Sequence, residues 1–203
     1  MIIFEINNTN TNLIVKIYTR GDGDFGKSID FLEKTLIPSN TKEKIKKYII
    51  KNQIKRLALR GEMIVSKNNF VHFSKDFKCS RSMVNGITNK KETSLSNLTS
   101  NLEFLVFEVI EPSLTPKNQF ILANNLNLNK VDFKVISKKD LISDIEKNKN
   151  KLLNSIPGVI LTTYRNTYNY DIDGIIISSN KKYALPESGN PEYSIAFKIN
   201  GEG

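Results

Sequence analysis

Short apolar segments separated by polar turns recur along the chain and predict β-strands. The runs 2–6 and 13–18 flank a polar segment, which predicts a β-hairpin. In the segment 57–65, large apolar residues alternate with Arg60 and Glu62, so we expect one buried and one charged strand face. Further strands are predicted by the apolar character of the segments 104–110, 172–178 and 193–199.

Two helices are expected after the hairpin because apolar residues recur there at helical spacing. Ser28 is expected to cap the first, which ends at Leu36, and Thr41 is expected to cap the second. Pro38 separates them because proline interrupts a helix. Helical spacing also extends over 139–156, which predicts a single helix there.

Strands and helices follow one another without a regular strand–helix–strand rhythm, which predicts an α+β fold with largely antiparallel sheets flanked by helices. No long linker interrupts the chain, so we expect one domain over residues 1–200 and a short tail at 201–203. The sequence lacks a run of about 18 apolar residues and a signal-peptide pattern. Cys79 is the only cysteine, which excludes a disulfide framework and favours a cytoplasmic location. We expect Cys79 to be an ordinary buried thiol; a reactive thiol, favoured by the neighbouring Arg81, is the alternative.

The charge of the chain is strongly positive, with 30 Lys and Arg against 21 Asp and Glu and a formal net charge of +9. Such a chain is often a nucleic-acid binder, because lysines that neutralise phosphates release counterions. The sequence is also rich in Asn, Ile and Lys, a bias that AT-rich coding produces without selection for binding. Charge alone therefore leaves both interpretations open. The lysines of 42–47 equally fit a solvated helix face or contact with DNA phosphates.

Four short motifs carry residue types suited to nucleotide chemistry. The segment 19–26 holds three glycines, and the Arg-Gly-Glu of 60–62 places a glycine between two charges in a strand, where a ligand or another backbone can approach. Asp173 opens a strongly apolar strand, and Lys198 shares a strand face with two small residues, which leaves room for a phosphate. Each motif also has an ordinary structural explanation: a turn, a surface ion pair, a turn acid and a solvated lysine.

The order and spacing of these motifs over residues 2–200 resemble the adenylation domain of NAD-dependent DNA ligases. The matching segments are 19–26 (T-R-G-D-G-x-x-G), 60–62 (motif III), 104–109 (motif IIIa), 173–177 (motif IV) and 196–198 (motif V). The segment 80–86 is similar to the family's N-P-R-N-x-x-x-G, with Arg81 in register. Arg165 lies eight residues before Asp173, as a family arginine does.

The resemblance implies a nucleotidyltransferase fold and nucleotidyl transfer. In this chemistry a lysine attacks the α-phosphorus of NAD, releases nicotinamide mononucleotide and holds AMP. The AMP then passes to the 5′-phosphate at a nick, and the neighbouring 3′-hydroxyl displaces it. The resemblance thus implies NAD and Mg²⁺ as cofactors, nicked double-stranded DNA as partner, a role in DNA replication and repair, and no membrane.

The resemblance also implies a role for each site residue. The catalytic groups would be Lys198, which contacts the α-phosphate, and Asp173. The nucleotide contacts would be Arg20 and Glu62 at the ribose, Phe107 near adenine, Arg60 in the same motif as Glu62, and Arg81 and Arg165 at nicotinamide mononucleotide, phosphate or DNA. No residue is implied as a metal ligand. We expect Arg20, Arg60, Glu62, Asp173 and Lys198 to converge on one pocket.

Three departures from the family pattern bear on activity. The nucleophilic Lys-x-Asp-Gly motif does not occur in the chain, which starts about where that motif should have ended, so we expect the polypeptide alone to be inactive. Ser178 replaces the motif IV lysine, and Lys182 would share its strand face if that strand continued; Asn89 replaces an arginine expected after Arg81. The family's OB-fold, zinc module and helix-hairpin-helix region would be expected after Lys198, and its nicotinamide-recognition domain before the hairpin; we expect none of them within these 203 residues.

Two function hypotheses follow. The chain is a piece of a working ligase, either from a truncated gene or as one half of a split enzyme that needs a separate N-terminal ligase fragment. Alternatively, it is a non-catalytic, decayed ligase domain that retains nucleotide or DNA binding. An unrelated basic nucleic-acid-binding domain would require every ordered motif to be a coincidence.

Overall fold

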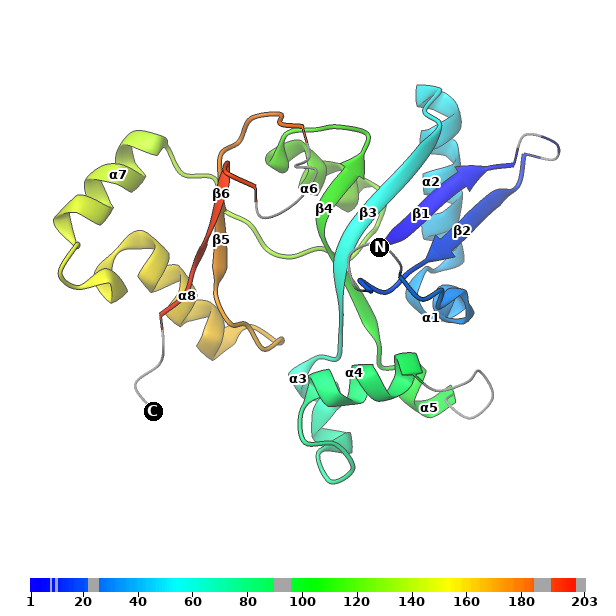
Figure 1. The fold of residues 1–203 in the computed structure, drawn as a ribbon, viewed down its shortest axis with the longest axis horizontal. Helices are drawn as coiled ribbons and strands as arrows, with labels where there is room; N and C mark the ends of the chain where they lie inside the picture. Colours follow the sequence, from blue (N-terminus) through cyan, green and yellow to red (C-terminus); the bar gives the residue numbers. More distant parts are fainter. Residues whose placement is uncertain (8, 10, 22–25, 90–95, 185–190, 200–203) are drawn as a thin grey trace. The chain divides into compact units, whose positions relative to one another are not determined.

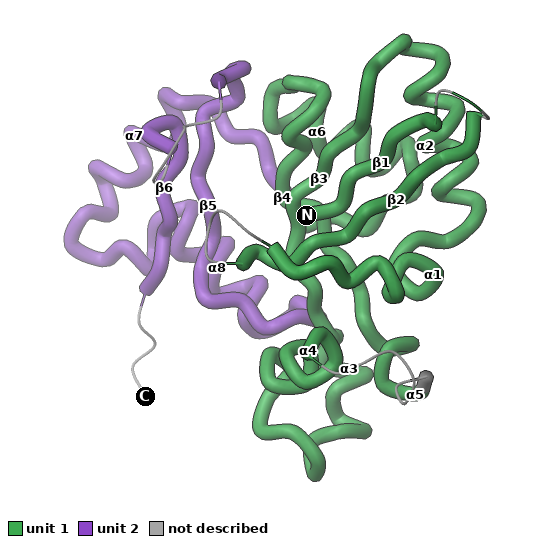
Figure 2. The backbone as a smooth tube through the Cα atoms, turned by 45° about the vertical axis from the view of Figure 1, so that its right-hand side comes forward, with its two compact units in different colours: residues 1–131 green, residues 132–203 purple. Residues whose placement is uncertain are grey.

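The computed structural model (Figure 1) describes residues 1–7, 9, 11–21, 26–89, 96–184 and 191–199. The chain divides into two compact units, unit 1 (residues 1–131) and unit 2 (residues 132–203), which Figure 2 colours separately. The expectation of one adenylation domain over residues 1–200 stays a prediction. The expected tail at 201–203 lies outside the described residues. The mixture of helices and antiparallel sheets confirms the α+β class.

Unit 1 is built on a four-stranded antiparallel sheet with the strand order β2–β1–β3–β4 (Figure 1). The strands are β1 (Ile2–Ile6), β2 (Leu13–Ile17), β3 (Arg56–Ile64) and β4 (Glu103–Glu111). The predicted hairpin and both later strands of this unit are therefore confirmed. β3 and β4 form the longest pairing, and their register shifts twice, between Ala58 and Leu59 and between Arg60 and Gly61.

The helical segments of unit 1 are η1 (Asp30–Leu32), α1 (Glu33–Leu36), α2 (Ser39–Asn52), α3 (Lys67–Phe70), η2 (Val71–Phe73), α4 (Ser80–Asn89), α5 (Ser96–Thr99) and α6 (Pro116–Asn125). Both predicted caps are wrong. Ser28 forms an isolated bridge with Tyr18 instead. Thr41 lies inside the first turn of α2, which begins directly after Pro38, and the Pro38 carbonyl accepts the Thr41 N–H at 3.0 Å. Thr41 is buried and its hydroxyl donates to Asn127 O, so tertiary packing determines its place.

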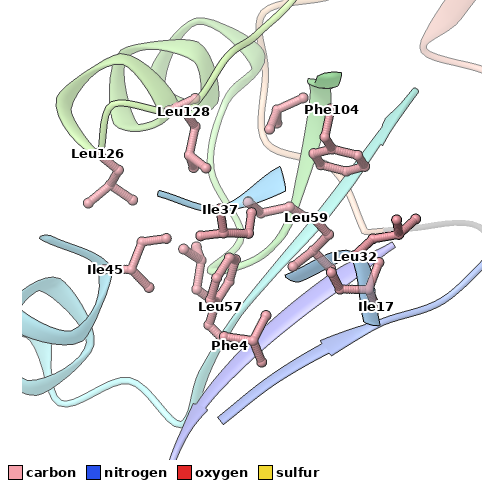
Figure 3. Packing of buried hydrophobic residues seen from close by; sticks show 14 of the residues in the cluster. Phe4, Ile17, Leu32, Ile37, Ile45, Leu57, Leu59, Phe104, Leu126 and Leu128 are labelled. Atoms are coloured by element: carbon pink, nitrogen blue, oxygen red, sulfur yellow. The ribbon is translucent and has the colours of Figure 1, made fainter. Parts of the chain in front are cut away.

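One face of this sheet forms the hydrophobic core with the surrounding helices, as Figure 3 shows. Phe4 of β1 and Leu57 and Leu59 of β3 are completely buried there, and α2 adds Ile45 and Ile49. Each large apolar side chain removed from water stabilises the fold by about 1.5–3 kcal/mol. Because successive strand residues point to opposite faces, the residues between these core positions lie on the other face of the sheet.

Unit 2 contains helices α7 (Lys138–Lys147) and α8 (Ile156–Thr167), the short η3 (Leu152–Asn154), and an antiparallel ribbon of β5 (Ile175–Ser178) and β6 (Ser194–Phe197). The single helix predicted over 139–156 is wrong, because α7 ends at Lys147. The Ser155 hydroxyl caps α8 by accepting the Gly158 N–H, and Pro157 lies in its first turn. A serine followed by proline is a helix-start signal that the sequence already contained.

The β5–β6 ribbon removes one argument for Lys182 as a substitute for the motif IV lysine. β5 ends at Ser178, so the strand does not continue to Lys182, and the shared strand face that we considered is absent. Among the helices of the described residues, none is both long and apolar enough to cross a bilayer.

Candidate functional site

The candidate residues of β3 and β4 lie on the sheet face opposite the core. Leu59 enters the core, so the alternation along β3 places Arg60 and Glu62 together on the other face. The register pairs Arg60 with Glu108 and Glu62 with Leu105. Phe107 lies at the register shift between these two pairs and remains 40% exposed. This face therefore presents a cation, a carboxylate and an open aromatic ring.

Gly61 has a structural explanation within the sheet. A Cβ atom at this position would lie 2.5 Å from the Leu105 carbonyl oxygen and 2.5 Å from Cζ of Phe104. The motif III glycine is therefore required by the close approach of β4, because any side chain would collide with the backbone of the neighbouring strand.

Arg60 is held by an acidic residue that the sequence reasoning did not single out. Its Nη1 lies 2.7 Å from Oε2 of Glu108 on β4. Glu108 is the single charged residue in the apolar segment 104–110, and this isolated charge was the feature of the sequence that could have identified it. By contrast, Glu62 is exposed, and no ion pair or hydrogen bond of its carboxylate is found within the described part of the chain.

The segment 19–26 begins close to this face. The Met1 ammonium donates to the Tyr18 carbonyl at 2.8 Å, and its pKa is lowered by burial and by the nearby positive charge of Arg60. Thr19 and Lys27 exchange hydrogen bonds that close the segment, and Gly21 has a positive φ of 64°. Arg20 is exposed at its start, while 22–25 lie outside the described residues.

Arg81 is exposed in the first turn of α4, a helix anchored in the core by Met83 and Ile87. Lys27 at the end of the segment 19–26 donates to the carbonyl of Thr88 at 3.0 Å, which ties that segment to the other end of α4. Just before α4, Cys79 is exposed, so the expectation of a buried thiol is wrong. Hydrogen bonds from Ser82, with a smaller contribution from Arg81, lower the pKa of the Cys79 thiol.

Three candidate residues of unit 2 are brought together at one end of the β5–β6 ribbon. Arg165 on α8 donates from Nη2 to the carbonyl oxygen of Asp173 at 3.0 Å. The pairing of Ile175 with Phe197 then brings Gly174 beside Lys198. A Cβ on Gly174 would lie 2.7 Å from Cγ of Lys198, so the glycine makes room for the lysine stem.

Lys198 also lines an open depression on unit 2. The other lining residues are Asn150, Lys151, Leu152, Leu153, Asn154 and Ile199, which come from η3 and its flanks and from the end of β6. Two ammonium groups and two amides offer donors to an anion, and the leucines provide an apolar floor.

A protein-built metal site is not found among the described residues, which contain no group of three or more His, Cys, Asp or Glu side chains that could hold a metal ion. Magnesium commonly binds through one or two carboxylates together with the phosphates of a substrate. The donors among the described residues therefore do not by themselves form a magnesium cage.

Comparisons with known proteins establish the family. A family model described as the NAD-dependent DNA ligase adenylation domain matches residues 6–202. The chain is 32% identical over 185 residues to the DNA ligase of Acanthamoeba polyphaga mimivirus, 29% over 198 residues to putative DNA ligase 205R of Invertebrate iridescent virus 6, and 26% over 201 residues to the DNA ligase of Borreliella burgdorferi.

These matches cover 90%, 93% and 92% of this chain, but 26%, 28% and 27% of the respective relatives. The chain thus spans about a quarter of the length of the curated relatives that it matches. It belongs to the NAD-dependent DNA ligase adenylation domain family.

Proposed function

We propose that this chain is the nucleotide-binding part of an NAD-dependent DNA ligase, which transfers AMP from NAD to the 5′-phosphate of nicked double-stranded DNA and so seals the nick. The observation that carries the proposal is the pairing of β3 with β4, where the exposed Glu62 pairs with Leu105, two residues before the exposed Phe107. Family membership over residues 6–202 supports it.

The adenosine part of NAD fits this sheet face. A carboxylate accepts short, charge-assisted hydrogen bonds from hydroxyl groups, so Glu62 is suited to the ribose. The Phe107 ring is suited to stacking with adenine, because aromatic rings pack favourably in offset or edge-to-face arrangements. We assign Arg20, which starts the segment beside this face, to the same part of the nucleotide.

The phosphates fit the cationic groups. Lys198 would offset negative charge on the α-phosphate as its bond to the leaving group breaks, which lowers the barrier to phosphoryl transfer. Arg165 fixes the main chain at Asp173, and Gly174 leaves room for the Lys198 stem, so these residues would orient the ammonium. Arg81 would contact nicotinamide mononucleotide, phosphate or DNA.

Glu62→Ala tests the assignment of the ribose site. Isothermal titration with AMP, NAD and adenosine should show that the variant loses about 1.5–3 kcal/mol of binding free energy for all three ligands, because each contains the ribose that the charged acceptor contacts. Glu43→Ala, which removes an exposed glutamate from α2, is the matched control and should bind like wild type. Equal affinities for Glu62→Ala and wild type would remove Glu62 from the site.

The non-catalytic alternative rests on a specific observation: the 203 residues contain no Lys-x-Asp-Gly motif. Both alternatives retain the nucleotide contacts described above. They differ in whether the protein takes part in covalent AMP transfer, so nucleotide binding alone does not separate them, and a labelling experiment is required.

A further inference from the structure

Arg60 lies between two carboxylates on the open face of the unit 1 sheet. Glu108 lies opposite it on β4, with Arg60 Nη1 and Glu108 Oε2 2.7 Å apart. Glu62 lies two residues along β3, which corresponds to about 6.7 Å along an extended strand. An arginine side chain is long enough to reach either carboxylate, and the structure shows it paired with Glu108.

The two carboxylates differ in their surroundings. The Glu108 side chain is only 21% exposed and engages Arg60, whereas Glu62 is exposed and has no ion pair among the described residues. If Arg60 turned to Glu62, the guanidinium would occupy the oxygens that the proposed function assigns to ribose hydroxyls. In the observed arrangement the guanidinium is engaged by Glu108, and the Glu62 carboxylate is left without it.

We propose that Glu108 is a positioning residue, which holds Arg60 away from Glu62 and so keeps the Glu62 carboxylate available to a nucleotide ribose. This inference rests on the proposed function of the same site. It changes the role of Arg60 from a nucleotide contact, as the family resemblance implied, to the partner of Glu108.

Two variants test this role, because the proposal predicts that adding Arg60→Ala to Glu108→Ala strengthens nucleotide binding instead of weakening it further. Glu108→Ala releases Arg60 to Glu62 and should weaken AMP and adenosine binding by about tenfold, the effect of losing a charged acceptor. The double variant Arg60→Ala/Glu108→Ala removes the competing guanidinium and should bind both ligands more tightly than Glu108→Ala. Glu108→Asp keeps a carboxylate and should bind more tightly than Glu108→Ala.

The opposite result is equally clear. If Arg60 contacts the nucleotide itself, the double variant will bind AMP as weakly as Glu108→Ala or more weakly, and the inference fails. Thermal unfolding of every variant shows whether weaker binding comes from a loss of folding. If Glu108→Ala is unstable, Glu108→Gln replaces it, because glutamine preserves the shape of the side chain.

A second measurement needs no ligand. A crystal structure of Glu108→Ala or Glu108→Gln should show the Arg60 guanidinium within hydrogen-bonding distance of Glu62. A guanidinium that stays in its original place, or turns to solvent, overturns the inference. If wild type bound neither AMP nor adenosine, the proposed function would fail in the titration, while this structure would still decide whether Glu108 keeps Arg60 from Glu62.

Discussion

Arg56 and Glu111 show how a single pair of side chains links β3 to β4 at the end of the sheet. The Arg56 Nε donates to Glu111 Oε2 at 2.8 Å, and a second bond joins Nη2 to Oε1. The hydrogen bond from Arg56 lowers the pKa of Glu111, and the same bond raises the pKa of Arg56. Both side chains are more than one-third exposed, so solvent screens the pair.

Glu111→Gln should therefore have a small, pH-dependent effect on stability. A carboxyl whose pKa is lowered in the folded state stabilises the fold above its ordinary pKa of about 4.3, and this contribution disappears as the pH falls through the lower folded value. At pH 7 the variant should be less stable by about 0.2–1 kcal/mol. Urea unfolding of wild type and variant should show this difference shrinking as the pH falls below the ordinary carboxyl pKa of about 4.3. A difference independent of pH would contradict the ion-pair explanation.

At the scale of elements, the pairing of β3 with β4 depends on Gly61. In Gly61→Ala, the new Cβ would meet the Leu105 carbonyl oxygen at 2.5 Å, and a backbone atom in a paired strand cannot move aside easily. We expect urea unfolding to show a loss of about 1–3 kcal/mol, the usual effect of overpacking.

Gly86→Ala is the control for Gly61→Ala. This glycine lies inside helix α4, where the nearest atom is the flexible ring carbon Cε1 of Phe77 at 3.3 Å. Alanine favours a helix over glycine by up to about 1 kcal/mol, so this variant should be no less stable than wild type. If Gly61→Ala unfolded at the same urea concentration as Gly86→Ala, the strand-packing explanation of the motif III glycine would be wrong.

The elements also show what the sequence could predict. Apolar runs identified β1, β2 and β4, and the alternation of apolar and charged residues identified β3, because these strands contribute buried side chains to one core. Sequence pattern failed at Thr41, where tertiary packing overrides a local capping preference, and at 139–156, where apolar spacing continues across a break between α7 and α8. Ser155 and Pro157 are a helix-start signal at that break, but the prediction of a single helix followed the spacing of apolar residues instead.

Part of the candidate site was equally accessible from sequence. Motif order singled out Glu62, Phe107 and Lys198 as candidates, because the chemistry of each motif requires a particular residue type, and their roles stay predictions. The Arg60–Glu108 pair was not accessible in this way, since it depends on a register shift between β3 and β4 that leaves no regular trace in the sequence. The expectation that residues of both units converge on one pocket stays a prediction.

At the scale of the whole molecule, the missing nucleophile motif gives a direct prediction. We expect no covalent adenylate on this 203-residue chain, because it contains no Lys-x-Asp-Gly. The chain is incubated with adenine-labelled NAD and magnesium, denatured, and tested for retained label, with an active full-length ligase of the same family as the positive control. Acid-labile AMP linked to a lysine of this chain would refute the prediction.

The proposed function requires the chain to hold a nucleotide through separate adenosine and phosphate contacts. If it does, AMP and NAD should bind with Kd values between about 1 mM and 1 μM, or about −4 to −8 kcal/mol. Lys198 is the residue that separates the two kinds of contact, because it would touch phosphate only. Lys149→Ala, at an exposed lysine of the same unit, is the matched control.

Calorimetric titration of Lys198→Ala with NAD, AMP and adenosine is the most direct test of that claim. The variant should bind NAD and AMP more weakly than wild type by about 1.5–3 kcal/mol, the range for a charged hydrogen bond, while its affinity for adenosine, which has no phosphate, stays the same. If Lys198→Ala weakened adenosine as much as AMP, the lysine would support the fold rather than contact the phosphate, and the site proposed for this chain would be wrong.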